Sequence, residues 1–552
     1  MAKRSGKDQR IGRRDFLKKG AAGGVGATAA VALGSHTQVD AQGRIRWDHV
    51  ADVVIAGAGA SGLPAAIMAR DNGASVIVID ENHDIGGHGM LSGGRVPLGG
   101  GTSLQKKYGI EDSADQVYLD HTTPLHNEFK YADRDLIRVW ADENVPTFDF
   151  LVENGVKFID RAPVQELSKV PRLVVAQVYS TDLKETINGR AGSGVVRPLE
   201  KSARAKGATF LLRHKLTAIR RERASSGRVL GITATFEGRE VNIQARKGVI
   251  IATGGHTSNV EFRRMFDPRL TEEYQVAGEP WSRQGADGEI AAIAVGASLW
   301  GTANQSSEND RAVTKTQHIG CRWGYSSLKW NPAGPIFGKA VASGLSVRDF
   351  QDVILVTQVG LRFWNEIDET YAFVNAALGT NGNLGRGAKK NGGGPIWAIF
   401  DADALQREAW VPAPPNVDPN GWFFSGDTIA DLARRIVNPY QLQPMPARAL
   451  EDTIARYNSH VDAGKDADFG KPTPRHKIQK PPFYAAWSTP ILHDSLTGLR
   501  INAKTQVIDT RGQVIPGLYC VGEAAGGFAL HGLPRVTVFG RIAGREAALA
   551  KA

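Results

Sequence analysis

The stretch from residue 51 to residue 80 limits the fold of this chain more than any other. It holds an apolar run, three glycines in Gly-x-Gly-x-x-Gly spacing, an Ala-rich segment and a second apolar run that ends at Asp80. The apolar runs predict buried parallel strands, and the Ala-rich segment predicts a helix between them. This order of strand, glycine triplet, helix, strand and acid predicts a βαβ unit of a Rossmann-like α/β domain that binds a dinucleotide.

Each part of this unit has a physical role. Gly57 allows a tight turn out of the strand, Gly59 lets the backbone approach a pyrophosphate, and Gly62 lets the helix pack closely on the strand. The helix N-terminus presents N–H groups and a positive dipole end to the phosphates. Asp80, 18 residues after Gly62, can accept hydrogen bonds from ribose hydroxyls. The alternative is a glycine-rich turn without a ligand, and the motif alone does not separate NAD from FAD.

Further motifs extend the pattern. Gly86-Gly87-His88 and Ser92-Gly93-Gly94 form a second small-residue loop, Ala252-Thr253-Gly254-Gly255 ends another apolar run, and residues 517–524 have the sequence Gly-Leu-Tyr-Cys-Val-Gly-Glu-Ala. From about residue 52 to the C-terminus, the chain resembles the flavoprotein family of fumarate reductases, succinate dehydrogenases and 3-ketosteroid dehydrogenases. The resemblance implies FAD as cofactor. It also implies a Rossmann-like FAD-binding domain, with a parallel sheet, helices and an inserted β-hairpin region, and an inserted α+β cap domain.

The resemblance also implies which residues contact FAD. Relatives hold the adenine at the positions of Leu216 and Thr217, and they place a carboxylate near the ribitol at the position of Glu523. Asp287 faces the cofactor in relatives, and a plain helix N-cap is the alternative here. The implied set is Gly57, Gly59, Ala60, Ser61, Gly62, Asp80, Glu81, Gly87, His88, Ser92, Gly93, Gly94, Leu216, Thr217, Ala252, Thr253, Gly254, Asp287, Gly522, Glu523 and Val538.

His88 raises the question of how FAD is attached. Some relatives bond FAD covalently through a histidine in this loop, but here the spacing to Gly93-Gly94 is one residue shorter. Relatives that bind FAD without a covalent bond usually carry a small polar residue at this place. We expect non-covalent binding, with covalent attachment as the alternative.

The N-terminus is strongly basic. The first 19 residues hold eight Lys or Arg against two Asp, which is +6 of the chain's formal +10. Arg13-Arg14-Asp-Phe-Leu-Lys, followed by an apolar run at 21–33, resembles a twin-arginine export signal. We expect residues 1–41 to be a cleaved signal peptide and the enzyme to be periplasmic; a disordered basic tail is the alternative. No stretch is long and apolar enough to predict a transmembrane helix, and no basic patch interleaved with aromatics indicates nucleic acid.

Regular alternation of strands and helices fades after about residue 305, where Pro, Gly and aromatic residues become more frequent. We therefore expect the FAD-binding domain to span 49–304 and 488–552, with the cap domain at 305–487 inserted between its parts. Seven of the eleven tryptophans lie in that cap. They suit a bulky or aromatic substrate, but packing of an aromatic core explains them equally well. Elsewhere the pattern predicts helices at 135–144, 147–153, 193–205, 287–295 and 536–551, strands at 208–213, 215–220 and 248–252, and a hairpin at 228–245.

The two cysteines, Cys321 and Cys520, predict free thiols rather than a disulfide across two domains. The chain has no Cys-x-x-Cys-His motif, so we expect no c-type haem on it, and no metal site is predicted. An enzyme of this kind then needs a separate electron donor or acceptor.

Catalytic candidates follow from the resemblance and from its departures. Residues 360–366 resemble the family's Gly-x-Arg-Phe-x-Asn-Glu segment, but Thr370 stands where the fumarate reductases place a proton-donating arginine. At the place of their histidine pair this chain has His493-Asp494, so one histidine is missing. Their carboxylate-binding arginine lies in a longer loop than the short His-Gly-Leu-Pro-Arg loop at 531–535 here. These departures count against fumarate itself. The candidates that remain are Tyr371 as a proton carrier, Arg535 as an anchor for a carboxylate or carbonyl, and His531 and His493 as orienting groups.

The sequence thus predicts an exported FAD-dependent oxidoreductase that transfers a hydride between flavin N5 and a carbon next to a carbonyl, by desaturation or by alkene reduction. Its substrate would be a small molecule. The main alternative is a flavoprotein electron-transfer subunit that works with a separate haem or quinone partner. An NAD-binding module without enzymatic activity is disfavoured by Gly522-Glu523 and by the export signal.

Overall fold

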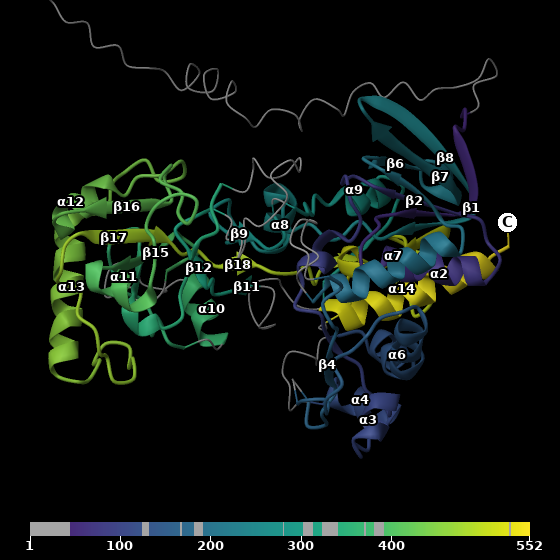
Figure 1. Cartoon of the computed structure of the whole chain (residues 1–552). Helices are drawn as coiled ribbons and strands as arrows, with labels where there is room; N and C mark the ends of the chain where they lie inside the picture. Colours follow the sequence, from purple (N-terminus) through teal and green to yellow (C-terminus); the bar gives the residue numbers. More distant parts are fainter. Residues whose placement is uncertain are drawn as a thin grey trace, which may run out of the picture. The chain divides into compact units, whose positions relative to one another are not determined.

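The computed structural model describes most of the chain, and its elements are labelled in Figure 1. The described residues are 45–123, 132–165, 168–180, 191–279, 281–301, 313–322, 341–368, 371–379, 391–528 and 532–551. For residues 313, 314, 371, 372, 374 and 375 only the backbone is described. The predicted signal peptide lies outside these ranges. Every element below belongs to the unit that begins at residue 48.

An eight-stranded sheet forms the larger layer, with the strand order β20-β21-β8-β1-β2-β5 and a hairpin of β6 and β7 beside β8. Strands β21, β8, β1, β2 and β5 run parallel, and β20 pairs antiparallel with β21. This confirms the predicted parallel sheet with an inserted hairpin. The bounds are β1 His49–Ala56, β2 Val76–Asp80, β5 Thr209–Leu212, β6 Lys215–Arg223, β7 Ser226–Phe236, β8 Arg239–Ile251, β20 Gln506–Ile508 and β21 Val514–Cys520.

Strand β8 differs from the prediction. The sequence pattern separates a hairpin arm ending at residue 245 from a strand that begins at residue 248, but the two form one continuous strand. A bulge makes this possible, because the register against β1 shifts between Ala51, opposite Ala245, and Val53, opposite Gly248. The predicted hairpin turn at Gly238 is confirmed, with φ at +79°.

Two helices pack against each other along the sheet, α2 (Gly62–Asp71) and α14 (Gly532–Leu549), and they lie side by side in Figure 1. A Cβ on Gly540 would lie 2.2 Å from the carbonyl oxygen of Ser61, and one on Gly544 would lie 2.2 Å from that of Ala65. These residues are four apart on each helix, so one glycine face of α14 meets one face of α2. Helix α14 begins at residue 532, before the predicted residue 536.

Shorter elements surround this layer. The predicted helix at 193–205 is confirmed as α7. The helices are α3 Ser103–Lys107, α4 Ala114–Asp120, α5 Arg134–Asp142, α6 Asn144–Glu153, α7 Ser193–Ala205, α8 Val260–Phe266 and α9 Asp287–Ile293. The short strands are β3 Arg95–Pro97, β4 Leu173–Val175, β9 Gln275–Val276, β10 Leu299–Trp300, β11 Val313–Thr314, β12 His318–Ile319, β13 Leu345–Ser346, β18 Ile491–Leu492 and β19 Gly498–Leu499.

The segment predicted as a cap contains a four-stranded antiparallel sheet in the order β14-β15-β17-β16, with helices beside it. Trp397, Trp422 and Trp487 pack edge to face in its core, with ring centroids 4.9–5.2 Å apart. For these tryptophans, core packing is therefore the explanation. The bounds are β14 Ile354–Thr357, β15 Ile396–Phe400, β16 Phe423–Gly426, β17 Phe483–Trp487, α10 Tyr371–Leu378, α11 Ala402–Glu408, α12 Ile429–Arg435 and α13 Ala447–Asp462. The domain boundaries themselves stay a prediction.

Arg362 lies in a buried ion network within this segment. Its guanidinium donates to both carboxylate oxygens of Glu366 at 2.8 Å and to Asp466 at 2.9 Å. Lys471 lies 3.3 Å from Glu366, and all four side chains are buried. The family-like motif at 360–366 is thus held within this segment by the buried ion pairs of Arg362 and Glu366.

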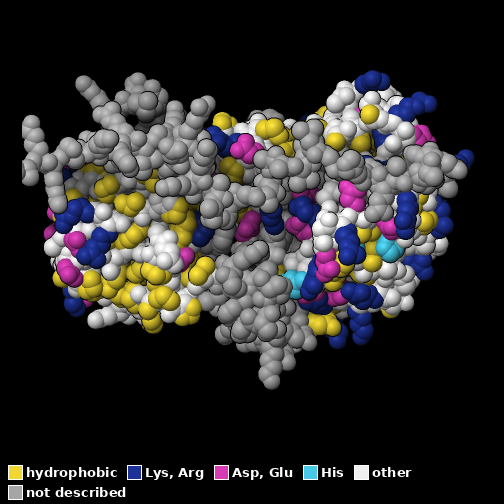
Figure 2. All heavy atoms as spheres, turned by 90° about the horizontal axis from the view of Figure 1, so that it is seen from above, with side chains coloured by type: hydrophobic (Ala, Val, Ile, Leu, Met, Phe, Trp, Pro, Cys, Tyr) yellow, Lys and Arg dark blue, Asp and Glu magenta, His cyan; other side chains and the backbone are white. Residues whose placement is uncertain are grey.

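On the face shown in Figure 2, lysine and arginine side chains of the described residues lie interspersed with acidic ones. Ion pairs are numerous among the described residues; Arg138, for example, pairs with Asp115 and Asp142. Cys321 and Cys520 are free thiols, and both are buried. Among the described residues, no helix has the length and apolar character needed to cross a bilayer.

Candidate active site

The glycine loop after β1 is shaped by close backbone contacts. A Cβ on Gly57, where φ is +111°, would lie 2.1 Å from the carbonyl oxygen of Ala252, and one on Gly62 would lie 1.9 Å from that of Gly57. Only glycine fits at these two positions. Gly59 differs, because the nearest atom to a Cβ placed there, the carbonyl oxygen of Gly86, would be 3.8 Å away. Its backbone therefore faces space that a ligand can enter.

The start of α2 is suited to an anion. Its first turn holds no acidic residue, and the side chain of its N-cap, Ser61, makes no capping hydrogen bond. The N–H groups and the positive dipole end of the helix are thus not neutralised by a carboxylate of the same turn. Ala60 and Ser61, both buried, connect the glycine loop to this helix.

Asp80, at the end of β2, is hydrogen-bonded to the glycine loop that follows β1. Its carboxylate accepts hydrogen bonds from the backbone N–H of Ala58 at 2.7 Å and of Asn82 at 2.9 Å. Burial raises the pKa of Asp80 to about 6, against the lowering effect of these N–H groups. The acid is thus placed beside the glycine triplet, where the sequence predicts it.

Lys215 joins two of the predicted cofactor residues. Its Nζ lies 2.7 Å from Asp287 and 3.1 Å from Glu81. Asp287 is the first residue of α9 and Ala286 is the N-cap, so the N-cap interpretation of Asp287 is wrong. The predicted adenine contacts, Leu216 and Thr217, follow Lys215 directly along β6; Leu216 is buried and Thr217 is exposed.

The second small-residue loop forms a 3₁₀ helix, η1 (Gly87–Leu91), which carries His88. Gly87 and Gly94 have positive φ, and a Cβ on Gly94 would lie 2.6 Å from Ala191. Ser92 accepts a hydrogen bond from the N–H of Gly94 at 3.3 Å, and Gly93 is exposed. The loop therefore returns sharply toward the start of α7.

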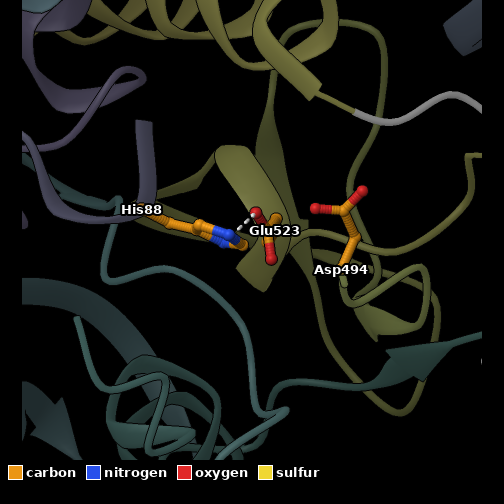
Figure 3. Close-up of side chains that lie close together, drawn as sticks. All are labelled: His88, Asp494 and Glu523. Carbon is orange, nitrogen blue, oxygen red and sulfur yellow. Dashed lines mark ion pairs between the residues drawn. The ribbon is translucent and has the colours of Figure 1, made fainter. Parts of the chain in front are cut away.

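Glu523 lies between His88 and Asp494 in Figure 3, and the three side chains come from distant parts of the sequence. Oε1 of Glu523 is 3.6 Å from Nδ1 of His88. Oε2 accepts hydrogen bonds from the amide of Gln284 at 2.7 Å and from the backbone N–H of Ser495 at 3.3 Å. Gly522 precedes Glu523 at the end of β21, in the short helix η4 (Gly522–Ala524).

Behind this cluster lies a fully buried pair, His256 and Glu289. Nδ1 of His256 is 3.2 Å from Glu289, and the backbone N–H of His256 donates to the hydroxyl of Ser495 at 2.9 Å. Burial lowers the pKa of His256 to about 3 and raises that of Glu289 well above its ordinary value. They connect the loop after Ala252, Thr253 and Gly254 to the segment that carries His493.

The four predicted catalytic residues are not all brought together in the described part of the chain. His493 is about half exposed; its Nδ1 lies 3.1 Å from Asp494, and its ring centre lies 5.8 Å from that of His88. Arg535 is buried and donates to the carbonyl oxygens of Gly522 and Ala525, at 2.7 and 2.9 Å. Burial lowers the pKa of Arg535, against the effect of Glu523 and Asp494.

Tyr371 begins α10, where only the backbone is described, and His531 lies outside the described residues. Val538, on α14, is wholly buried.

The residues present suit FAD. Gly59 leaves room for a pyrophosphate, the α2 N-terminus offers an uncompensated positive end, and Glu523 and His88 lie at the carboxyl ends of the same parallel sheet. When bound, FAD would supply the hydride chemistry. This fold and this site define a dinucleotide-binding flavoprotein.

The chain belongs to the FAD binding domain family, whose model matches residues 52–304 and 330–535. It is 30% identical over 545 residues to the acrylate reductase flavoprotein subunit of Shewanella woodyi, covering 95% of this chain and 94% of that protein. It is 28% identical over 511 residues to the cytochrome-type fumarate reductase of Shewanella frigidimarina, covering 90% and 77%. The protein is an FAD-dependent oxidoreductase that acts on CH–CH groups.

The fold also matches solved structures. A 3-ketosteroid delta1-dehydrogenase from Sterolibacterium denitrificans superimposes with a TM-score of 0.65 at 18% identity, over 91% of this chain and 99% of that one. At this identity the match concerns the fold alone.

Several residues of the site were not predicted from the sequence. Gln284, Lys215, His256 and Glu289 each act through side chains far away in the chain. Gln284 belongs to none of the predicted motifs, and Lys215, although it directly precedes Leu216, has no local pattern that indicates its ion pairs. His256 directly follows Gly254-Gly255, and Glu289 follows Asp287 by two residues, so proximity to the predicted motifs was a usable signal for this pair.

Proposed function

We propose that the protein reduces the carbon–carbon double bond of a small unsaturated carbonyl compound. One observation carries this proposal: the His493–Asp494 pair stands beside the loop that bears His88, on the segment that returns to the large sheet. An imidazole next to a carboxylate is a suitable proton carrier. The similarity to acrylate and fumarate reductases supports reduction over desaturation.

The reaction adds a hydride to one carbon and a proton to the other. His493 holds the proton at its imidazole, and the carboxylate of Asp494 lies 3.1 Å from its Nδ1. Arg535 fixes the turn after β21 through two carbonyl oxygens, and so places Gly522 and Glu523. Tyr371 and His531 remain proposed as a proton carrier and an orienting group.

The charges near His493 favour a substrate with one carboxylate or none. Asp494 and Glu523 both lie near this position, with their oxygens and a His88 nitrogen within 4.8 Å of one another. A second substrate carboxylate placed beside these acids would be repelled. This agrees with the departures from the fumarate reductase motifs.

We further propose that the enzyme is exported through its twin-arginine leader, that it binds FAD non-covalently, and that a separate haem or quinone protein exchanges its electrons. The description of the Shewanella woodyi relative as a subunit supports a separate redox partner. A role as an electron-transfer subunit without its own substrate is the second candidate.

Anaerobic stopped-flow kinetics test the reaction. The enzyme, reduced with dithionite, is mixed with acrylate, fumarate or an unsaturated 3-ketosteroid, and reoxidation is followed at the flavin absorbance. We expect fast reoxidation by a compound with one carboxylate or a ketone, and slowing of roughly 100-fold or more in His493→Gln. His49→Gln, at an exposed histidine, is the control. Failure of every unsaturated carbonyl compound to reoxidise the enzyme would overturn the proposal in favour of the electron-transfer role.

A further inference from the structure

We propose that Gln284 is a positioning residue that fixes the carboxylate of Glu523 and the imidazole tautomer of His88. Gln284 lies just before α9 and is buried. The proposal rests on the FAD site described above and adds to it a residue that none of its motifs contains.

The amide of Gln284 can adopt only one orientation. Its Oε1 lies 2.6 Å from the hydroxyl of Thr257, and its Nε2 lies 2.7 Å from the carboxylate of Glu523. If the amide were flipped, its oxygen would face the carboxylate at that distance, which is repulsive. The NH₂ group therefore points to Glu523, and the Thr257 hydroxyl donates to the amide oxygen.

This orientation determines where His88 carries its proton. Nε2 of Gln284 also lies 3.3 Å from Nδ1 of His88. An amide NH₂ can only donate, so Nδ1 must accept. The neutral imidazole therefore carries its proton on Nε2. Nδ1, although only 3.6 Å from Glu523, cannot then donate to that carboxylate.

The backbone holds Gln284 in place independently of its side chain. Its N–H donates to the hydroxyl of Ser258 at 3.0 Å, and its carbonyl oxygen accepts from the N–H of Ser258 at 3.0 Å. Thr257 and Ser258 follow the loop at the end of β8, while Glu523 and His88 come from two other loops. Gln284 thus links three loops of the cofactor site through one side chain.

Variants distinguish the effect of the orientation of the Gln284 amide from the effect of losing its contacts. Gln284→Leu removes both hydrogen-bonding groups at similar volume, and Gln284→Glu keeps the acceptor for Thr257 but places a carboxylate opposite Glu523. Thr257→Val removes the group that orients the amide, and Thr257→Ser keeps it. Gln105→Leu is the control: Gln105 is also buried and also bridges a carboxylate, Asp112, but through contacts outside the site.

The first readout is the Kd for FAD, from quenching of flavin fluorescence on addition to the FAD-free protein. We expect Kd to rise roughly 10-fold in Gln284→Leu and roughly 100-fold in Gln284→Glu. Thr257→Val should raise it a few-fold, and Thr257→Ser and Gln105→Leu should change it less than about twofold. If Gln105→Leu weakened FAD binding as much as Gln284→Leu, the effect would come from a general loss of stability, and the proposal would be overturned.

The second readout is the tautomer of His88, from ¹⁵N NMR of histidine-labelled protein at alkaline pH, assigned with His88→Gln. Wild type should show an unprotonated Nδ1. Gln284→Glu should show a protonated Nδ1, because a carboxylate can only accept there. An unchanged tautomer in Gln284→Glu overturns the proposal. This readout does not need FAD, so a wild-type protein that failed to bind flavin would refute the proposed function while still testing Gln284.

Discussion

The carboxylate of Glu523 lies 3.6 Å from Nδ1 of His88, although the two residues stand near opposite ends of the chain. Glu523 lies in η4, just after β21, and His88 lies in η1, after β2; both strands belong to the same sheet, in which they run parallel. The carboxyl ends of parallel strands meet at one edge, where ligands of doubly wound folds bind. His88 therefore belongs to a polar cluster in which its Nδ1 already has a donor, Gln284.

The first prediction concerns attachment of the flavin. Because Nδ1 of His88 accepts from Gln284 and Nε2 carries the proton, the ring offers no free nitrogen lone pair for a bond to FAD. Acid precipitation of the yellow protein should release all flavin into the supernatant, and His88→Asn should remain yellow. Flavin that stays with the denatured polypeptide in wild type, and not in His88→Asn, would show a covalent bond instead.

The second prediction concerns the glycine loop. Gly57→Ala and Gly62→Ala place a Cβ about 2 Å from a backbone carbonyl oxygen, so the loop must move and FAD binding should be lost. Gly238→Ala is the matched control, since Gly238 also has positive φ but no atom lies within 4 Å of its Cβ position. It should cost about 1 kcal/mol of stability and leave the flavin spectrum intact. Both properties can be read from absorbance and thermal unfolding.

The third prediction concerns Ala286, the N-cap of α9. Its φ of +64° is left-handed, which is unfavourable for a residue with a Cβ. Ala286→Gly should therefore stabilise the protein by about 1 kcal/mol. Ala291→Gly, inside the same helix, should destabilise it by about the same amount. Chemical denaturation measures the stability of both variants. If Ala286→Gly destabilised the protein as Ala291→Gly does, the backbone at Ala286 would not be strained.

The sequence predicts the βαβ unit nearly to the residue, because strand, glycine triplet, helix and acid are all written in one local stretch. The sequence pattern wrongly divides β8 into two strands. The bulge at residues 246 and 247, which keeps β8 continuous, is recognised only from the pairing of β8 with β1. Gln284 and Lys215 were missed for a related reason. Their roles depend on partners that folding brings near, and a single glutamine or lysine carries no local pattern.

The same reason explains why the sequence singled out residues 360–366 without finding what they do. Arg362 and Glu366 are four apart and visible together, but Asp466 and Lys471 complete the network from about a hundred residues later. Local spacing can indicate one ion pair; it cannot indicate that the pair is buried among other charges.

The fourth prediction concerns pH. Asp52 accepts from the N–H and hydroxyl of Ser75, both at 2.8 Å, and from Arg246 at 2.9 Å. Burial alone would raise its pKa, but these partners lower it to about 2. A carboxyl whose folded pKa lies below its unfolded value stabilises the protein above about pH 4, and this contribution is lost as the pH falls to about 2.

Asp52→Asn should therefore lower the free energy of unfolding at pH 7 by about 1 kcal/mol. This figure is smaller than the pKa shift alone implies, because solvent screens the charge of Asp52. The difference from wild type should vanish near pH 2. Urea unfolding at several pH values provides the measurement, and Asp115→Asn, at a largely exposed side chain, is the control. A difference that persisted unchanged at pH 2 would show that Asp52 acts through packing rather than charge.

The fifth prediction concerns the buried network around Arg362. Arg362→Met leaves Glu366 and Asp466 buried with only Lys471 to balance them. Breaking a buried network in this way is strongly destabilising, so we expect a loss of about 3–5 kcal/mol. Arg448→Met removes an exposed arginine 3.9 Å from Asp452 and should change stability by less than about 0.5 kcal/mol. Urea unfolding followed by tryptophan fluorescence reports directly on this segment, because Trp397, Trp422 and Trp487 form its core. A small effect of Arg362→Met would mean that water enters the network and screens the two carboxylates.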